Sequence, residues 1–90
     1  MSELRAHKIK RLAMRSMRRG IKEMDLILSA YADHCLAQMS DAALSHYDAL
    51  LNESDHDLYQ WVTGQMPPPD AHAALISQIQ DLLAQQSVGR

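Results

Sequence analysis

The first interruption of the helical pattern of this chain is Arg19-Gly20-Ile21-Lys22-Glu23, an RGxxE element. Glycine is a poor helix former, so we expect Gly20 to end one helix as its C′ residue and to act as the N-cap of the next. Glu23 then falls at the third helical position, where its carboxylate can reach back to a free backbone N–H. Arg19 complements the carbonyl end of the first helix and offers a planar fork to a carboxylate or phosphate. The stretch predicts a helix–turn–helix corner that a partner can approach closely.

The same stretch marks a boundary in charge. Residues 1–22 contain eight Lys or Arg and one acid, whereas residues 23–90 contain ten acids and one base. The net charge of −2 therefore conceals a strong dipole. Such a field orients a charged partner and is weakened by salt, so we expect a working surface near the boundary.

Apolar residues recur at helical spacing on both sides of the boundary, and no segment shows the alternation of a strand. Five helices are expected, at residues 4–17, 21–38, 41–52, 56–63 and 71–86. The fold class is all-α: a compact five-helix bundle, one small domain over residues 1–90, with a tail at about 87–90 that frays.

Polar residues and glycine mark the ends of the later helices. Ser40, either Ser54 or Asp55, and Asp70 are expected as N-caps, and Gly64 as a C-cap. Three consecutive prolines at 67–69 predict a stiff connector before the last helix. The inward faces are expected to contain Ile9, Leu12, Ala13, Ser16, Met17, Met24, Ile27, Leu28, Tyr31, Cys35, Met39, Leu44, Tyr47, Leu50, Leu51, Leu58, Trp61, Val62, Leu75, Ile76, Ile79, Leu82 and Leu83.

Composition disfavours several classes of protein. A chain of this size builds one modest core, which favours a binding module over an enzyme with an enclosed active site. No apolar run approaches the length of about 20 residues that spans a bilayer. A single cysteine, Cys35, fits a reducing compartment and is expected to be a buried small hydrophobe. The sequence shows no nucleophile–base pair, metal-ligand set or Gly-rich phosphate loop.

A basic stripe runs along the first helix, made of Lys8, Arg11, Arg15, Arg18 and Lys22. One interpretation is a solvated helix face, and another is a small protein that binds nucleic acid or an anionic surface through this helix. The acidic remainder of the chain and the lack of interleaved aromatics weigh against nucleic acid. An Arg-rich amphipathic start also resembles a transit peptide, but its apolar stripe continues into the fold, so we expect it to be the first helix of the domain.

An acidic cluster with one histidine lies at Glu53, Asp55, His56 and Asp57. One imidazole and no EF-hand spacing make helix capping a better interpretation than metal binding, so no metal ligands are assigned. Trp61 is interpreted as a core anchor, with one edge open to solvent.

Two stretches together resemble a known family. They are Arg18–Leu28 (RRGIKEMDLIL) and Tyr47–Glu53 (YDALLNE), the latter followed by Asp57–Trp61 (DLYQW) and the prolines. In this order they resemble the SdhE family, the bacterial counterparts of succinate dehydrogenase assembly factor 2, over about residues 8–84. Members are small five-helix proteins, in agreement with the helices expected above. The middle of the second helix, residues 29–34, is less aromatic than in many relatives.

The resemblance implies a function. Such proteins are assembly factors, not enzymes. They bind the flavoprotein subunit of succinate dehydrogenase, or of related fumarate reductases, and promote covalent attachment of FAD to a histidine of that subunit. FAD then belongs to the partner, and this chain binds no cofactor firmly. The resemblance also implies a cytoplasmic, bacterial protein, monomeric when free, with no nucleic-acid or membrane partner.

The family signature is the RGxxE element, which places Arg19, Gly20 and Glu23 in contact with the partner. The resemblance extends this surface less strongly to neighbouring positions of the turn and of the fourth helix, which are Arg15, Arg18, Asp25, Asp57 and Trp61.

Overall fold

The structure is a computed structural model that describes the backbone of residues 3–88 and the side chains of residues 3–85. Its elements are α1 (Arg5–Arg15), α2 (Lys22–Cys35), the 3₁₀ helix η1 (Leu36–Gln38), α3 (Asp41–Leu50), α4 (Asp55–Val62) and α5 (Asp70–Val88). No strand occurs among the described residues, and the prediction of a small all-α domain of five helices is confirmed. The last helix continues to Val88, and the end of the tail that was expected to fray, residues 89–90, lies outside the described residues.

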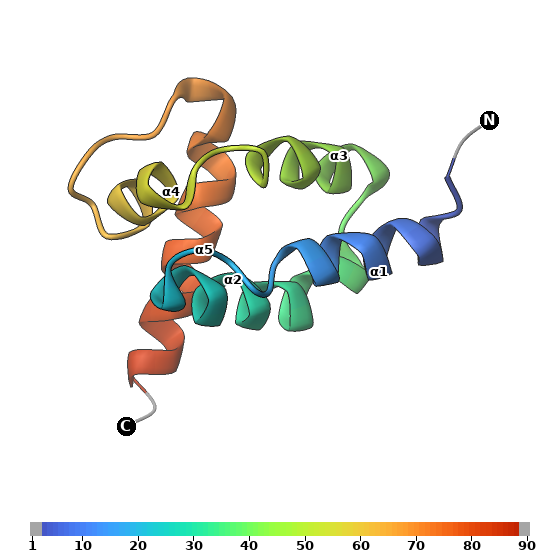
Figure 1. Cartoon of the computed structure of the whole chain (residues 1–90), viewed down its shortest axis with the longest axis horizontal. Coiled ribbons are helices and arrows are strands. Elements are labelled where there is room, and N and C mark those ends of the chain that lie inside the picture. Colours follow the sequence, from blue (N-terminus) through green and yellow to red (C-terminus); the bar gives the residue numbers. More distant parts are fainter. Residues whose placement is uncertain (1–2, 89–90) are drawn as a thin grey trace.

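The helices pack as a compact bundle of 40 × 29 × 23 Å (Figure 1). The first two helices form an antiparallel pair, and α3 packs against α1. The last helix crosses the bundle and contacts α2, α3 and α4. None of the described helices combines the length and hydropathy that crossing a bilayer requires.

The core is apolar and comes mainly from α2 to α5. Its fully buried members are Met24, Leu28, Tyr31, Leu36, Leu44, Tyr47, Leu50, Leu58, Ile76 and Ile79, together with Leu12 from α1. Among the residues expected to face inward, Ile9, Ala13, Ile27, Cys35, Leu82 and Leu83 are half-buried at its margin. The prediction that Met17 faces inward is wrong, since 45% of the residue is exposed. The reason is that α1 ends at Arg15, so Met17 lies in a turn and not on the helix face.

Serine caps mark the starts of α3 and α4. The hydroxyls of Ser40 and Ser54 accept the backbone N–H groups of Ala43 (3.1 Å) and Asp57 (3.2 Å), which confirms both residues as N-caps. The C-cap of α4 is Thr63, one residue before the predicted Gly64. Gly64 follows it with φ +80°, a left-handed conformation that favours glycine just after a helix end.

The predicted helix at 21–38 is divided. Regular α-helix ends at Cys35, whose backbone departs to φ −120°, ψ −30°, and a 3₁₀ turn follows at η1. Tightening of the last turn is common at a helix end. It buries Leu36, a core residue that the helical spacing of the sequence did not single out.

Candidate functional site

The RGxxE element begins in the connection between α1 and α2, residues 16–21, called here the α1–α2 turn, and its last two residues, Lys22 and Glu23, are the first two of α2. Ser16 is fully buried and closes α1. Its hydroxyl donates to the carbonyl of Leu12 (2.8 Å) and forms a 2.6 Å hydrogen bond with the hydroxyl of Tyr47. Burial raises the pKa of Tyr47 to about 12. The turn thus leaves α1 from a point that is fixed to α3.

The turn is made differently from the sequence prediction. Arg18 adopts the left-handed backbone conformation, with φ +58°, and Gly20 does not. The N-cap of α2 is Ile21. The expectation that Gly20 is the C′ residue of one helix and the N-cap of the next is therefore wrong. The physical reason is that Ser16 ends α1 early, so the reversal of the chain falls at Arg18.

Gly20 is instead held by a carboxylate from another part of the chain. Its backbone N–H donates to Oδ2 of Asp55 (2.5 Å), at the start of α4. A Cβ at Gly20 would lie 3.1 Å from the same oxygen, which is a tight contact. A side chain at position 20 would therefore crowd Asp55, whereas no positive φ calls for glycine here.

Arg19 is bound within the molecule. Its Nε donates to Oδ1 of Asp55 (2.6 Å), and the two side chains are 12% and 17% exposed. Its terminal nitrogens donate to backbone carbonyls of the α1 end and the loop before α4, namely those of Arg15 (3.1 Å), Leu51 (3.4 Å) and Glu53 (3.4 Å). The planar fork is largely occupied, and Arg19 joins the α1–α2 turn to the loop between α3 and α4.

Glu23 has the opposite environment. It is exposed, at the second position of α2, and its carboxylate forms no hydrogen bond or ion pair with the described residues. The predicted capping role is wrong because the N–H of Gly20 is bonded to Asp55. The carboxylate of Glu23 is consequently available to another molecule.

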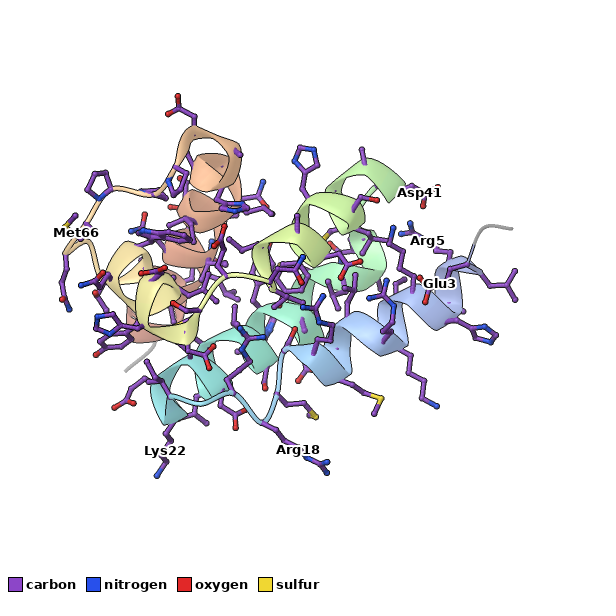
Figure 2. All side chains as sticks on the ribbon, turned by 45° about the horizontal axis from the view of Figure 1, so that its top comes forward. Glu3, Arg5, Arg18, Lys22, Asp41 and Met66 are labelled. Carbon is purple, nitrogen blue, oxygen red and sulfur yellow. The ribbon has the colours of Figure 1, made fainter. Side chains whose placement is uncertain are left out.

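The basic stripe is neither a solvated face nor an open cationic surface. Most of it packs on α3 in a contact called here the ionic seam. Arg5 pairs with Asp41 (2.8 Å), and Lys8 donates to Ser45 (2.8 Å). These contacts lie at the N-terminal end of α1, where Figure 2 shows Arg5, Glu3 and Asp41 close together.

Asp48 is the centre of the ionic seam. Arg11 binds both of its carboxylate oxygens (3.1 and 3.0 Å), and Arg15 binds Oδ1 (2.5 Å) while its other nitrogen donates to Asn52 (2.8 Å). Hydrogen bonds from Arg11, then the charge of Arg11 and the bond from Arg15, hold the pKa of Asp48 below its usual value despite partial burial. Arg15, expected at the partner surface, is therefore engaged within the chain.

Four basic residues form no ion pair with the described residues: Lys8, Lys10, Arg18 and Lys22. Arg18 and Lys22 project outward on the same side of the molecule, one from the α1–α2 turn and one from the start of α2 (Figure 2). With Glu23 they make the exposed charged groups of this corner.

The remaining predicted site residues differ in how deeply they are buried. Asp25 is half-buried and accepts from the hydroxyl of Ser29 (3.3 Å). Asp57 is half-buried in the first turn of α4. Trp61 is 9% exposed and belongs to the core, where its ring lies 5.8 Å from that of His72. The structure thus places Trp61 as the core anchor that the sequence suggested.

Two residues were missed by sequence reasoning. Asp55 was considered only as a cap or a member of an acidic cluster, yet it contacts both Arg19 and Gly20. His72, buried on α5, forms a 2.8 Å contact with Glu53 and joins α5 to the loop before α4. Within the described part of the chain, no three His, Cys, Asp or Glu side chains gather as a metal site would require.

The sequence matches a family of proteins described as the flavinator of succinate dehydrogenase, over residues 10–83. Curated relatives bear the name succinate dehydrogenase assembly factor 2, mitochondrial. That of Saccharomyces cerevisiae is 43% identical over 76 residues, which is 79% of this chain and 47% of the yeast protein. That of Meyerozyma guilliermondii is 48% identical over 61 residues, which is 68% of this chain and 45% of the relative. That of Candida glabrata is 53% identical over 53 residues, which is 59% of this chain and 35% of the relative.

The chain spans less than half the length of these curated relatives. The relatives are mitochondrial by name, so the bacterial cytoplasmic location expected from the sequence stays a prediction. The match to the family covers the α1–α2 turn, the ionic seam from Lys10 onward and all of the core helices up to Leu83. The chain belongs to the family of succinate dehydrogenase flavinators, which are assembly factors.

Proposed function

We propose that this chain binds the flavoprotein subunit of succinate dehydrogenase, or of a related fumarate reductase, and promotes the covalent attachment of FAD to that subunit. The observation that carries the proposal is the family match over residues 10–83, which includes the RGxxE element. In this role the chain is an assembly factor and not an enzyme, and FAD is held by the partner.

The corner formed by the α1–α2 turn and the start of α2 is the proposed docking surface. It offers an unpaired carboxylate at Glu23, outward cations at Arg18 and Lys22, and a glycine at which no side chain blocks an approaching surface. Opposite charges side by side suit a partner with a complementary polar surface, and such charges set orientation more than affinity.

The proposed contribution to flavin attachment is orientation. Covalent attachment by the flavoprotein itself requires a histidine, the flavin and a mobile segment to meet in one geometry, and holding reacting groups in place accelerates a reaction strongly. The chain would supply a rigid surface against which the flavoprotein is ordered. Asp25 and Asp57 flank this surface as further contacts, and Arg15 and Arg19 support it from within.

Coexpression tests the proposal. The flavoprotein subunit would be produced with and without this chain, and covalent flavin read as fluorescence of the subunit band on a denaturing gel. We expect labelling to rise with the chain present and to fall toward the level without it for Gly20→Arg and Glu23→Ala. Asp33→Ala, which removes an exposed acid farther along α2, is the matched control and should label as the unmodified chain does. Equal labelling with and without the chain would overturn the proposal.

The contacts of the basic helix bear on the second interpretation, binding of nucleic acid through that helix. Arg5, Lys8, Arg11, Arg15 and Arg19 already contact α3 or the loop after it, so few cations remain to track phosphates. No observation in the structure favours that function, and we do not propose it.

A further inference from the structure

We propose that Asp55 is a positioning residue of the docking surface: its single carboxylate holds both Arg19 and Gly20, so that the RGxxE element is shaped before a partner arrives. The inference rests on the function proposed above. It divides the element into an inner part, Arg19 and the N–H of Gly20, and an outer part that meets the partner, Glu23 and its neighbouring cations.

The first step is the geometry of the carboxylate. Oδ1 accepts from Nε of Arg19 at 2.6 Å, and Oδ2 accepts from the N–H of Gly20 at 2.5 Å. One side chain therefore bonds two consecutive residues that lie 36 and 35 positions away in sequence. Both bonds involve an ionised acceptor, which makes them stronger than bonds between neutral groups. Two bonds to one rigid carboxylate fix the direction of the turn as well as its distance from α4.

The second step is how little else holds the turn. Arg18, at its apex, is exposed and adopts a left-handed backbone, a conformation that is unfavourable for a non-glycine residue. Met17 is 45% exposed. Apart from the fixed points at Ser16 and Ile21, the turn depends on Arg19 and Gly20 for its position. Loss of Asp55 would leave the N–H of Gly20 without its acceptor and would leave Arg19 held only by its bonds to backbone carbonyls.

The third step is that the contact between Asp55 and Gly20 explains why a glycine suits position 20. The Cα of Gly20 faces Oδ2 of Asp55 closely enough that a Cβ would sit 3.1 Å from it. A side chain at position 20 would press on the carboxylate before any partner is met. Arg19, Gly20 and Asp55 therefore meet in one contact, which a change at any of the three would disturb.

The fourth step links the inner part to the partner surface. Glu23 stands three residues after Gly20, in the first turn of α2, so the direction in which its carboxylate points follows from how the turn enters that helix. A surface that is ordered in advance loses less conformational entropy on binding. Asp55 thus acts on the affinity for the partner without touching it.

The test compares Asp55→Asn with Asp70→Asn. Both remove the charge of the first residue of a helix, α4 or α5, without changing the size of the side chain, but Asp70 is exposed and lies in another part of the chain. Affinity for the purified apo flavoprotein subunit of succinate dehydrogenase would be measured by calorimetry, at a temperature at which circular dichroism shows each variant to be folded.

We expect Asp55→Asn to bind about tenfold more weakly, as loss of one charge-assisted hydrogen bond implies, and Asp70→Asn to bind as the unmodified chain does. A role in stability alone would leave the affinity of the folded variant unchanged. Wild-type affinity of folded Asp55→Asn, alongside weak binding by Glu23→Ala, would overturn this inference and leave the proposed function standing. If Asp55→Asn does not fold, Asp55→Glu keeps the charge and displaces the carboxylate, and wild-type affinity in that variant would overturn the inference equally.

A second readout does not need the partner. Hydrogen exchange of the Gly20 amide, followed by NMR, should accelerate at least about tenfold in Asp55→Asn while the amide of Leu28 in the core keeps its rate. An unchanged rate at Gly20 would overturn the inference even if no flavoprotein bound. If the Gly20 amide exchanges faster in Asp55→Asn as expected, but the unmodified chain does not bind the flavoprotein subunit, the result would instead count against the proposed function.

Discussion

The ionic seam and the apolar core hold the molecule together by different physics. Across the seam, α1 meets α3 through four basic side chains, and Leu12 is its one fully buried apolar residue among those described. In the core, α2, α4 and α5 meet through side chains such as Leu28, Leu58 and Ile76, which are essentially inaccessible to water. The core makes the fold stable, and the seam fixes the position of α1 and therefore the place where the α1–α2 turn begins.

The contrast between the core and the seam predicts that substitutions in the core cause the largest loss of stability. Leu28→Ala should lower the free energy of unfolding by about 2–5 kcal/mol, since it removes fully buried methyl groups and leaves a cavity. Leu26→Ala, two residues away on the same helix and 64% exposed, is the matched control and should change it by no more than about 0.5 kcal/mol. Urea unfolding followed by circular dichroism measures both. Similar losses for the two variants would mean that α2 does not bury the face described here.

This contrast also shows what the sequence could predict. Helical spacing found the core because burial leaves a local record: Met24, Leu28 and Tyr31 recur every three or four residues and are all buried. Capping by Ser40 and Ser54 was equally local, since each serine acts on an N–H three residues away. The extent of the helices followed to within a few residues.

The seam and the inner part of the RGxxE element were not predicted, because their partners are distant in sequence. The basic stripe of α1 suggested solvent or an anionic partner, whereas its partners lie more than 30 residues away on α3. A signal was present: acceptors at Asp41, Ser45, Asp48, Asn52 and Asp55 repeat at helical spacing, as do the cations of α1. Two complementary stripes of equal period predict that their helices pack together.

The second prediction tests whether the seam is electrostatic. Asp48→Asn removes the carboxylate shared by Arg11 and Arg15, and should lower the free energy of unfolding by about 0.5–1 kcal/mol at low salt, the range of partly exposed ion pairs. In about 1 M salt, where screening acts over roughly 3 Å, the difference from the unmodified chain should shrink. The core variant Leu28→Ala should keep its deficit under the same conditions.

The control for salt is Asp41→Asn. Asp41 pairs with Arg5 but its side chain is 88% exposed, so its loss should cost less than about 0.5 kcal/mol at any salt concentration. Unfolding in urea at a series of salt concentrations measures both variants. If the deficit of Asp48→Asn did not depend on salt, the seam would be stabilised by packing of the arginine stems and not by charge, and the contrast with the core would be lost.

The smallest expected effect is on the pH dependence of stability. Arg11 and Arg15 hold the pKa of Asp48 below its ordinary value near 3.8, so the unfolded chain takes up this proton at a higher pH than the folded one. The stabilisation is therefore complete above the unfolded pKa, about 4, and is lost as the pH falls through the lower folded pKa. Arg11 lowers the pKa of Glu3 in the same direction.

Measured by urea unfolding at pH values between 2 and 7, the unmodified chain should lose stability below about pH 4 more steeply than Asp48→Asn does. The two curves should approach each other at the acid end, where the protonated Asp48 no longer differs in charge from asparagine. Glu3 still titrates in the variant, so its curve should keep a residual slope. Leu28→Ala should instead give a curve displaced by a nearly constant amount, because no proton is linked to the burial of a methyl group. Parallel curves for Asp48→Asn and the unmodified chain would mean that the charge of Asp48 contributes nothing across the seam, and that α1 is held against α3 by Leu12 and by its other polar contacts.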